Sequence, residues 1–127
     1  MAVHWVGPYR IVGRLGAGAM GQVYLAEDPR LRRKVALKTV SDATPRTPEA
    51  RRQLLHEARA AARLTHPNVA AIYDVVEAND AVHVVMEYVL GESLASRLRR
   101  GPLPVEAALD VGVQLADALA EAHAAGV

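Results

Sequence analysis

The sequence predicts an α+β fold, in which a five-stranded antiparallel sheet carries one helix and is followed by two further helices. Three observations predict this fold. Strand-like runs, with apolar and polar residues alternating at a period of two, fill residues 9–40 and are broken at strand lengths by glycine and proline. Residues 47–64 instead carry a helical apolar stripe. After Gly91 the composition changes to two helical segments.

Composition limits the possible functions. A chain of 127 residues that is 51% hydrophobic can bury one modest core, and the lack of cysteine excludes disulfides and thiolate zinc sites. A net charge of +1 argues against a nucleic-acid-binding surface. The first residues lack the basic and apolar regions of an export signal, and no apolar run is long enough to cross a membrane. We therefore expect a cytoplasmic globular chain with no nucleic-acid partner and no membrane segment.

Three glycines separate the first two predicted strands, residues 9–15 and 22–27. Gly16, Gly18 and Gly21 permit a turn whose backbone N–H groups can close over an anion, because no Cβ blocks the approach. The same spacing opens the dinucleotide-binding fold, where the last glycine would begin a long helix. Here a proline stops the chain after only a strand's length. The pattern therefore favours a hairpin that holds phosphate.

The third predicted strand, residues 34–40, places a lysine on a partly apolar face. Lys38 shares that face with Ala36 and Val40. Lysine occurs only at Lys34 and Lys38, whereas every other basic residue is arginine. A lysine near a strand end is commonly a solvated residue, but its compact charge on a flexible stem also suits a site that needs a point charge.

The predicted helix at residues 47–64 begins with Thr47 as N-cap and Pro48 in the first turn. Its apolar stripe consists of Leu54, Glu57, Ala61 and Leu64. A carboxylate on such a face needs a partner, because an unpaired buried charge costs several kcal/mol. We expect Lys38 to be the partner of Glu57. The alternative is a surface acid that pairs with an arginine one turn away.

The second half of the chain supplies two more strands and two helices. A break at residues 65–68 precedes predicted strands at 69–77 and 81–88, and predicted helices follow at 92–100 and 105–125. The last helix is stopped by Gly126 and is apolar on most sides. It needs a surface to pack on that nothing else in the chain supplies.

Five motifs stand in a fixed order along the chain. They are Gly16-x-Gly18-x-x-Gly21-x-Val23, Val35-Ala36-Leu37-Lys38, the helical Glu57, Leu64-Thr65-His66-Pro67-Asn68-Val69 and Val85-Met86-Glu87-Tyr88-Val89. Together they resemble the N-terminal lobe of a eukaryotic-like protein kinase of the bacterial serine/threonine type. The resemblance implies an N-terminal extension at 1–8, a kinase N-lobe with ATP-binding loop and hinge at 9–90, and an incomplete C-lobe of two helices at 91–127. It also implies ATP, Mg²⁺ and transfer of the γ-phosphoryl group to a protein substrate.

The resemblance also assigns roles to single residues. Lys38 holds the α- and β-phosphates and Glu57 fixes the lysine, which makes these two the candidate catalytic residues. Met86 is the gatekeeper, followed by a hinge whose backbone faces the adenine edge. The ribose position falls on Ser93, for which an N-cap hydroxyl is an equally good interpretation. The implied nucleotide-binding residues are Leu15, Gly16, Ala17, Gly18, Ala19, Met20, Gly21, Val23, Ala36, Lys38, Met86, Glu87, Val89 and Ser93.

Kinases of this type continue from the last helix into His-Arg-Asp and later Asp-Phe-Gly, which supply the catalytic aspartate and the Mg²⁺ ligands. Neither motif occurs up to Val127, so we expect the chain alone to be inactive. The favoured hypothesis is that these residues begin an active serine/threonine kinase, with a downstream membrane anchor left open. The alternative is a naturally truncated module that binds nucleotide or another protein through its exposed helix.

Overall fold

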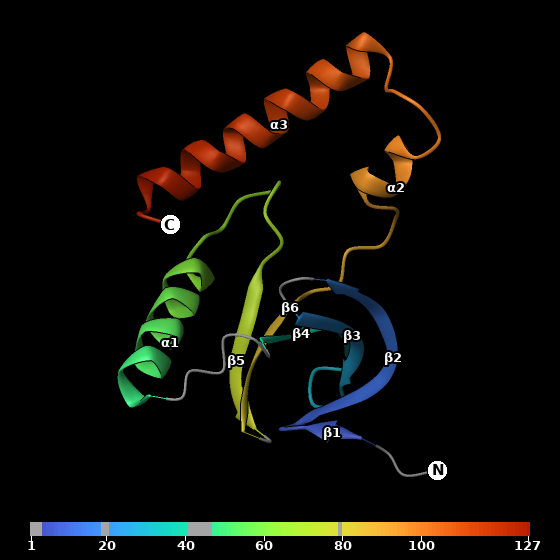
Figure 1. Ribbon diagram of the computed structural model, residues 1–127. Coiled ribbons are helices and arrows are strands. Elements are labelled where there is room, and N and C mark those ends of the chain that lie inside the picture. The colour runs from blue at the N-terminus through green and yellow to red at the C-terminus, as the bar shows by residue number, and fades with distance from the viewer. Residues whose placement is uncertain (1–3, 19–20, 41–46, 79) are drawn as a thin grey trace.

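The computed structural model describes residues 4–18, 21–40, 47–78 and 80–127. Its antiparallel sheet has the strand order β1-β2-β3-β4-β6-β5 (Figure 1). The described strands are β1 (Trp5–Val6), β2 (Tyr9–Gly18), β3 (Gly21–Asp28), β4 (Arg33–Val40), β5 (Ile72–Ala78) and β6 (Ala81–Glu87). The α+β class is confirmed, but the predicted count of five strands is wrong, because this sheet has six.

The additional strand, β1, lies within residues 1–8, which the sequence assigns to an extension. Val6 pairs with Tyr9 across a two-residue turn and is only 3% exposed. Gly7 has a φ of +55°, and a Cβ there would lie 2.9 Å from Cγ1 of Val76. A strand of two residues is too short to show an alternation of apolar and polar residues. The turn between Val6 and Tyr9 is therefore the one feature of the sequence that indicates this strand.

The glycine stretch forms a hairpin, as predicted. Strands β2 and β3 continue their antiparallel pairing into the glycines, and the last pair joins Gly18 to Gly21. The register shifts between Arg14 and Gly16, so Leu15 is an extra residue in β2. Such a bulge bends a strand and redirects a side chain. Two residues of the predicted site, Ala19 and Met20, lie outside the described residues.

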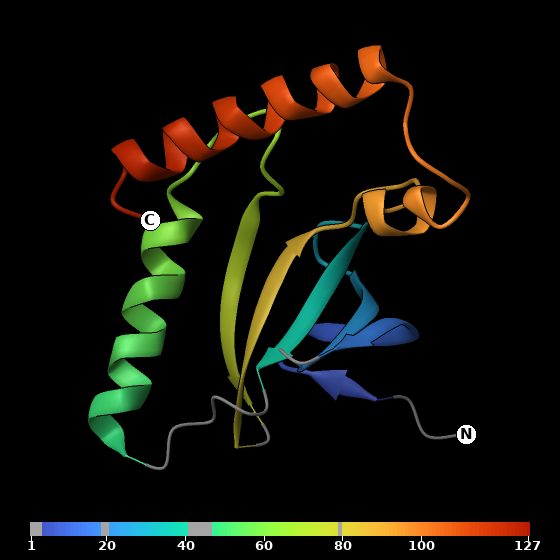
Figure 2. The ribbon, with the colours of Figure 1, turned by 45° about the horizontal axis from the view of Figure 1, so that its top comes forward.

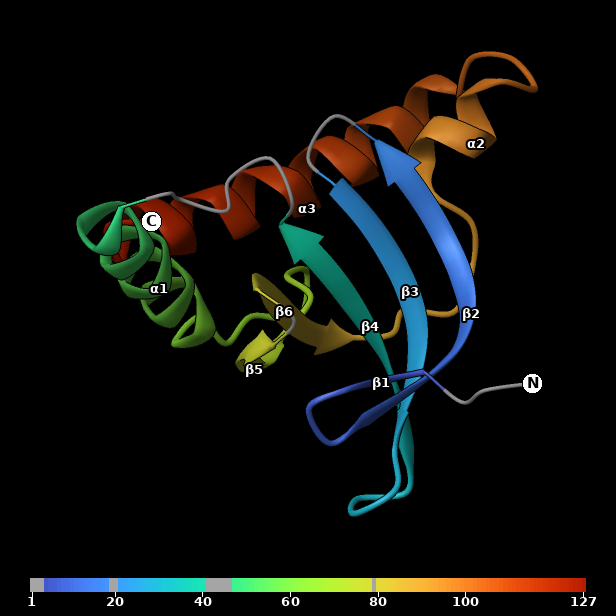
Figure 3. The same cartoon turned by 60° about the horizontal axis from the view of Figure 1, so that its bottom comes forward.

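The core lies on one face of β4 and is inaccessible to water. Val35 and Leu37 are fully buried, whereas Ala36 and Lys38 occupy the opposite face, as the alternation predicts. Figure 3 shows β2, β3 and β4 curving side by side. The buried core cluster consists of Val6, Tyr9, Ala26, Val35, Leu37 and Val85.

Helix α1 (Pro48–Ala62) packs against β5, at the edge of the sheet (Figure 1). The helix begins at Pro48, whose fixed φ suits a first turn, as predicted. Leu64 lies just after the helix and is buried, at 9% exposure. Since β6 lies between β5 and β4, this docking places α1 two strands away from Lys38.

Two helices follow the sheet, α2 (Leu94–Leu98) and α3 (Val105–Ala124). Figure 2 shows α3 crossing above α1 and the ends of the strands. Gly126, with a φ of +78°, ends α3, and the N–H of Val127 donates to the carbonyl of Ala122 at 2.9 Å. None of the described helices combines the length and apolarity needed to cross a bilayer.

Helix α3 leaves most of its apolar side chains in water. Its contact with the loop between α1 and β5 includes a hydrogen bond of 3.2 Å from Asn68 Nδ2 to Gln114 Oε1. Within α3 only Ala118 is classed as buried. The exposed apolar side chains are Val105, Leu109, Val113, Leu115 and Leu119. The prediction that the chain does not cover this helix is therefore confirmed for the described residues.

Candidate functional site

A cavity of about 640 Å³ lies between the sheet and α2. It combines the β2 bulge, the middle of β4, the segment after β6 and the start of α2. The lining residues are Leu15, Ala36, Glu87, Tyr88, Val89, Gly91, Glu92, Ser93 and Ser96. Five of the predicted nucleotide-binding residues therefore lie around one cavity, although they come from four separate segments. The sequence did not predict the contributions of Tyr88, Gly91, Glu92 and Ser96.

Leu15 and Ala36 form the sheet side of this cavity. The bulge in β2 leaves Leu15 45% exposed, although it belongs to a strand. Ala36 is 7% exposed and lies directly opposite Met86 in the register of β4 and β6. A methyl group is all that β4 presents at this point, so a flat ring can approach the sheet closely. Val23 and Met86 are half-buried neighbours that do not line the cavity.

The hinge segment is fixed by a reciprocal pair of hydrogen bonds. The backbone N–H of Glu87 donates to the carbonyl of Ala71 at 2.8 Å, and the N–H of Ala71 donates to Oε1 of Glu87 at 3.2 Å. The side chain of Glu87 thus holds the loop that connects α1 to β5. From the sequence, only the backbone of Glu87 was given a role.

Lys38 lies two residues beyond Ala36 on the same face of β4. It is half-buried, opposite Val23 of β3 on one side and Val84 of β6 on the other. This register brings the lysine beside the strand that begins at the glycine turn, which agrees with the sequence interpretation. Lys38 is not among the residues that line the cavity itself.

The predicted contact between Lys38 and Glu57 is absent from this structure. Glu57 is exposed, and its Oε1 accepts a hydrogen bond of 2.9 Å from Nε2 of Gln53. It lines a second cavity, of about 480 Å³, between α1 and the end of α3. The predicted burial of Glu57 is wrong here, because α1 docks on β5 and turns that part of its stripe toward water.

Ser93 is the N-cap of α2, and its Oγ accepts a hydrogen bond of 3.0 Å from the N–H of Ser96. The capping interpretation of Ser93 is therefore confirmed, and its place beside the cavity leaves the ribose interpretation open. The preceding residue, Glu92, accepts two hydrogen bonds from Arg100, at 2.6 and 2.8 Å. These bonds hold the pKa of the Glu92 carboxyl below its ordinary value, against a smaller effect of burial.

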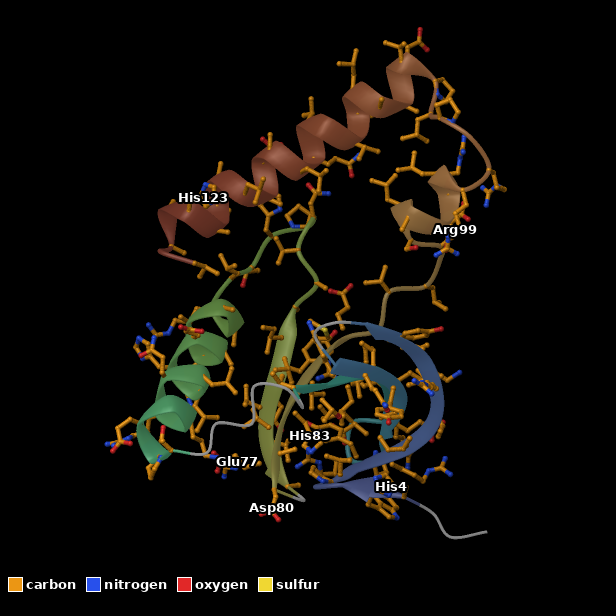
Figure 4. The ribbon with its side chains drawn as sticks, viewed as in Figure 1. His4, Glu77, Asp80, His83, Arg99 and His123 are labelled. Atoms are coloured by element: carbon orange, nitrogen blue, oxygen red, sulfur yellow. The ribbon has the colours of Figure 1, made fainter. Side chains whose placement is uncertain are left out.

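One buried histidine braces the end of β4 near Lys38. His83 lies within the sheet, and its Nδ1 is 3.0 Å from Oγ1 of Thr39 (Figure 4). Its Nε2 is 3.0 Å from the carbonyl of Ala78, which can only accept. Nε2 therefore carries a hydrogen toward that carbonyl, and Nδ1 pairs with the hydroxyl of Thr39. The side chain ties β4, β6 and the end of β5 together.

The described residues contain no candidate metal site. No three His, Asp or Glu side chains there are arranged to hold an ion.

Comparison with known proteins identifies this architecture. Residues 9–127 match the protein kinase domain family. The serine/threonine-protein kinase PknE of Mycobacterium bovis is 43% identical over 121 residues, covering 94% of this chain and 21% of PknE. The serine/threonine-protein kinase PrkC of Bacillus subtilis is 41% identical over 118 residues, covering 92% of this chain and 18% of PrkC.

A solved structure shows the same arrangement. The crystal structure of the Mycobacterium tuberculosis PknI kinase domain superposes with a TM-score of 0.86 at 33% identity, covering all of this chain and 53% of that one. The chain thus spans about a fifth of the two kinases above and about half of a solved kinase domain. The matched family, the relatives and the fold agree, and the chain therefore belongs to the protein kinase domain family.

Proposed function

We propose that the cavity of about 640 Å³ binds the adenosine part of ATP. The observation that carries this proposal is the placement of Ala36 and Lys38 on one face of β4, with Ala36 lining the cavity and Lys38 just beyond it. A flat base fits against a methyl group, between Leu15 and the hinge residues. The triphosphate, joined to that base through the ribose, would then extend toward the lysine and the glycine hairpin.

The phosphates of ATP, with Mg²⁺, would lie under that hairpin. The glycines allow its backbone N–H groups to approach phosphate oxygens, and Lys38 adds a compact positive charge. In the complete kinase, the γ-phosphoryl group passes to a hydroxyl of a protein substrate, as the names of the relatives indicate. Positioning and electrostatic stabilisation supply most of the catalysis of this transfer. These residues provide the positioning of the nucleotide.

The pairing of Lys38 with Glu57 remains part of the proposal. It requires α1 to move toward β4 from its position in this structure. The hydrogen bond from Gln53 to Glu57 would oppose this movement only weakly. An exposed pair of side chains four residues apart on a helix stabilises it by only about 0.2–0.5 kcal/mol. A bound nucleotide that attracts Lys38 toward its phosphates would favour the arrangement in which Glu57 completes the site.

The 127 residues alone are proposed to bind nucleotide without transferring phosphate, because the sequence contains neither His-Arg-Asp nor Asp-Phe-Gly. Incubation with Mg²⁺, labelled ATP and a generic serine/threonine substrate should give no labelled protein. Label transferred by a homogeneous preparation would contradict this part of the proposal.

The location of binding can be tested by following backbone amide NMR signals during titration with ATP. The largest shifts should fall on Leu15, Ala36 and Val89. A competing location is available, since a cavity of about 420 Å³ at the β3–β4 turn is lined by three basic residues, Arg32, Arg33 and Lys34, beside Glu27, Asp28 and Pro29. Shifts confined to that turn would contradict the proposal and indicate adsorption of the phosphates to a basic surface.

A further inference from the structure

Helix α2 forms one wall of the cavity but has little to stabilise it. It is five residues long and contains no buried residue. Isolated helices shorter than about 12–15 residues are marginal in water even for good helix formers. The N-cap bond from Ser96 to Ser93 satisfies one backbone group, but it restrains only the first turn of the helix. Interactions between the residues that flank the helix must therefore help to fix the shape of this segment.

The bidentate ion pair between Glu92 and Arg100 supplies such an interaction. Glu92 precedes the N-cap of α2 and Arg100 follows the C-cap, so the pair closes a loop around the whole helix. The two N–H···O distances are 2.6 and 2.8 Å. Bidentate pairs fix the relative orientation of two planar groups as well as their separation. The pair is therefore a geometric restraint on both ends of α2.

The restraint acts on the part of the cavity nearest the proposed sugar. Glu92, Ser93 and Ser96 line the cavity, whereas Arg100 does not. Each carboxylate oxygen of Glu92 accepts one hydrogen bond from Arg100, which fixes the orientation of the carboxylate beside the cavity. The Oγ of Ser93 accepts from Ser96, and its own hydrogen remains able to donate to a hydroxyl in the cavity.

We infer that the Glu92–Arg100 ion pair positions the wall of the cavity that receives the ribose, and that Arg100 affects nucleoside affinity without touching the ligand. This inference rests on the proposed adenosine site. It makes Arg100 a positioning residue whose effect depends on the sugar. The base approaches the opposite wall, formed by Leu15, Ala36 and the hinge, where α2 has no part.

The test compares adenine with adenosine on the whole chain. Arg100→Met keeps the apolar stem and removes the guanidinium fork. Because an exposed pair of good geometry contributes at most a few-fold to an equilibrium, adenosine affinity should fall about fivefold. Adenine affinity should stay within about twofold of the original value, because no contact to the base is changed. Both affinities can be read from amide NMR titrations.

Two variants serve as controls. Arg99→Met removes a neighbouring exposed guanidinium at the end of α2, which makes no ion pair among the described residues, and it should change neither affinity (Figure 4). Exchanging the charges, with Glu92→Arg and Arg100→Glu together, should restore part of the lost adenosine affinity. That rescue would separate a positioning effect from general loss of structure.

Equal adenosine affinity in Arg100→Met and the unchanged chain would overturn the inference while leaving the proposed function intact. Equal losses for adenine and adenosine would also overturn it, since they would indicate a general disturbance. If the unchanged chain binds neither adenine nor adenosine, the proposed function is contradicted, and the inference about Arg100 is contradicted as well.

Discussion

Tyr9 donates its phenolic hydrogen to Oδ2 of Asp74 at 2.8 Å, which joins the start of β2 to a bulged part of β5. Burial, followed by the bond to Asp74, raises the pKa of Tyr9 to about 12, so the hydroxyl keeps its hydrogen at physiological pH. The guanidinium of Arg30 lies over the Tyr9 ring, 5.7 Å from its centre. The hydrogen bond between Tyr9 and Asp74 joins residues that are 65 positions apart in the sequence.

Tyr9→Phe should lower the free energy of unfolding by about 1–3 kcal/mol, because it leaves one oxygen of a partly buried carboxylate without its donor. Urea denaturation at neutral pH measures the change. Tyr73→Phe is the matched control, since Tyr73 lies beside Asp74 but is 39% exposed, and it should change stability by less than about 0.5 kcal/mol. Equal effects from the two variants would remove the bond from its structural role.

Asp28 makes stability depend on pH at the acid end. Burial alone would raise its pKa, but the guanidinium of Arg30 and the backbone N–H groups of Arg30 and Leu31 outweigh it and hold the pKa below its ordinary value. The stability contributed by this carboxylate is therefore present above the unfolded pKa of about 3.9 and is lost as the pH falls through the lower folded value.

Asp28→Asn should therefore destabilise the chain at pH 7, and the difference from the unchanged chain should shrink at acid pH. Asparagine keeps an oxygen for the two backbone donors, so the variant isolates the charge. Urea midpoints at several pH values measure the effect. Asp110→Asn, on the exposed side of α3, is the control and should shift the midpoint little. A constant difference between Asp28→Asn and the unchanged chain at every pH would contradict the assignment.

Local patterns predicted the parts of the site that depend on neighbouring residues. The alternation along β4 correctly placed Val35 and Leu37 on one face and Ala36 and Lys38 on the other. Pro29, which stops the chain after a segment of strand length, correctly indicated that the glycines join two strands of a hairpin. These features are set by strand period and backbone restriction, which the sequence carries directly.

Features set by long-range docking were missed or predicted wrongly. The apolar stripe of α1 did not indicate that the helix would lie against β5, an arrangement that leaves Glu57 exposed and without the predicted contact to Lys38. The pairs Tyr9–Asp74 and Glu92–Arg100 join residues whose spacing matches no local period. Such contacts follow from the path of the chain in space.

Ala36→Leu should block the proposed adenine position. Ala36 lines the cavity and is 7% exposed, so a larger side chain there occupies space that the base needs. We expect nucleotide affinity to fall at least about tenfold, equivalent to about 1.4 kcal/mol. Calorimetric titration with ATP measures it. The control is Ala108→Leu on exposed α3, which should bind as before. Undiminished binding by Ala36→Leu would exclude this cavity as the adenine site.

The two lysines of the chain allow the most direct test of ATP binding. Lys38 is half-buried beside the glycine hairpin, whereas Lys34 is exposed four residues earlier on the same strand. Calorimetric titration with ATP and with adenosine should be compared for Lys38→Met, Lys34→Met and the unchanged chain. Lys38→Met should weaken ATP at least about tenfold and adenosine hardly at all, because the lost charge faces only phosphate. Lys34→Met should behave as the unchanged chain. Equal ATP affinity in all three would contradict the proposed nucleotide site.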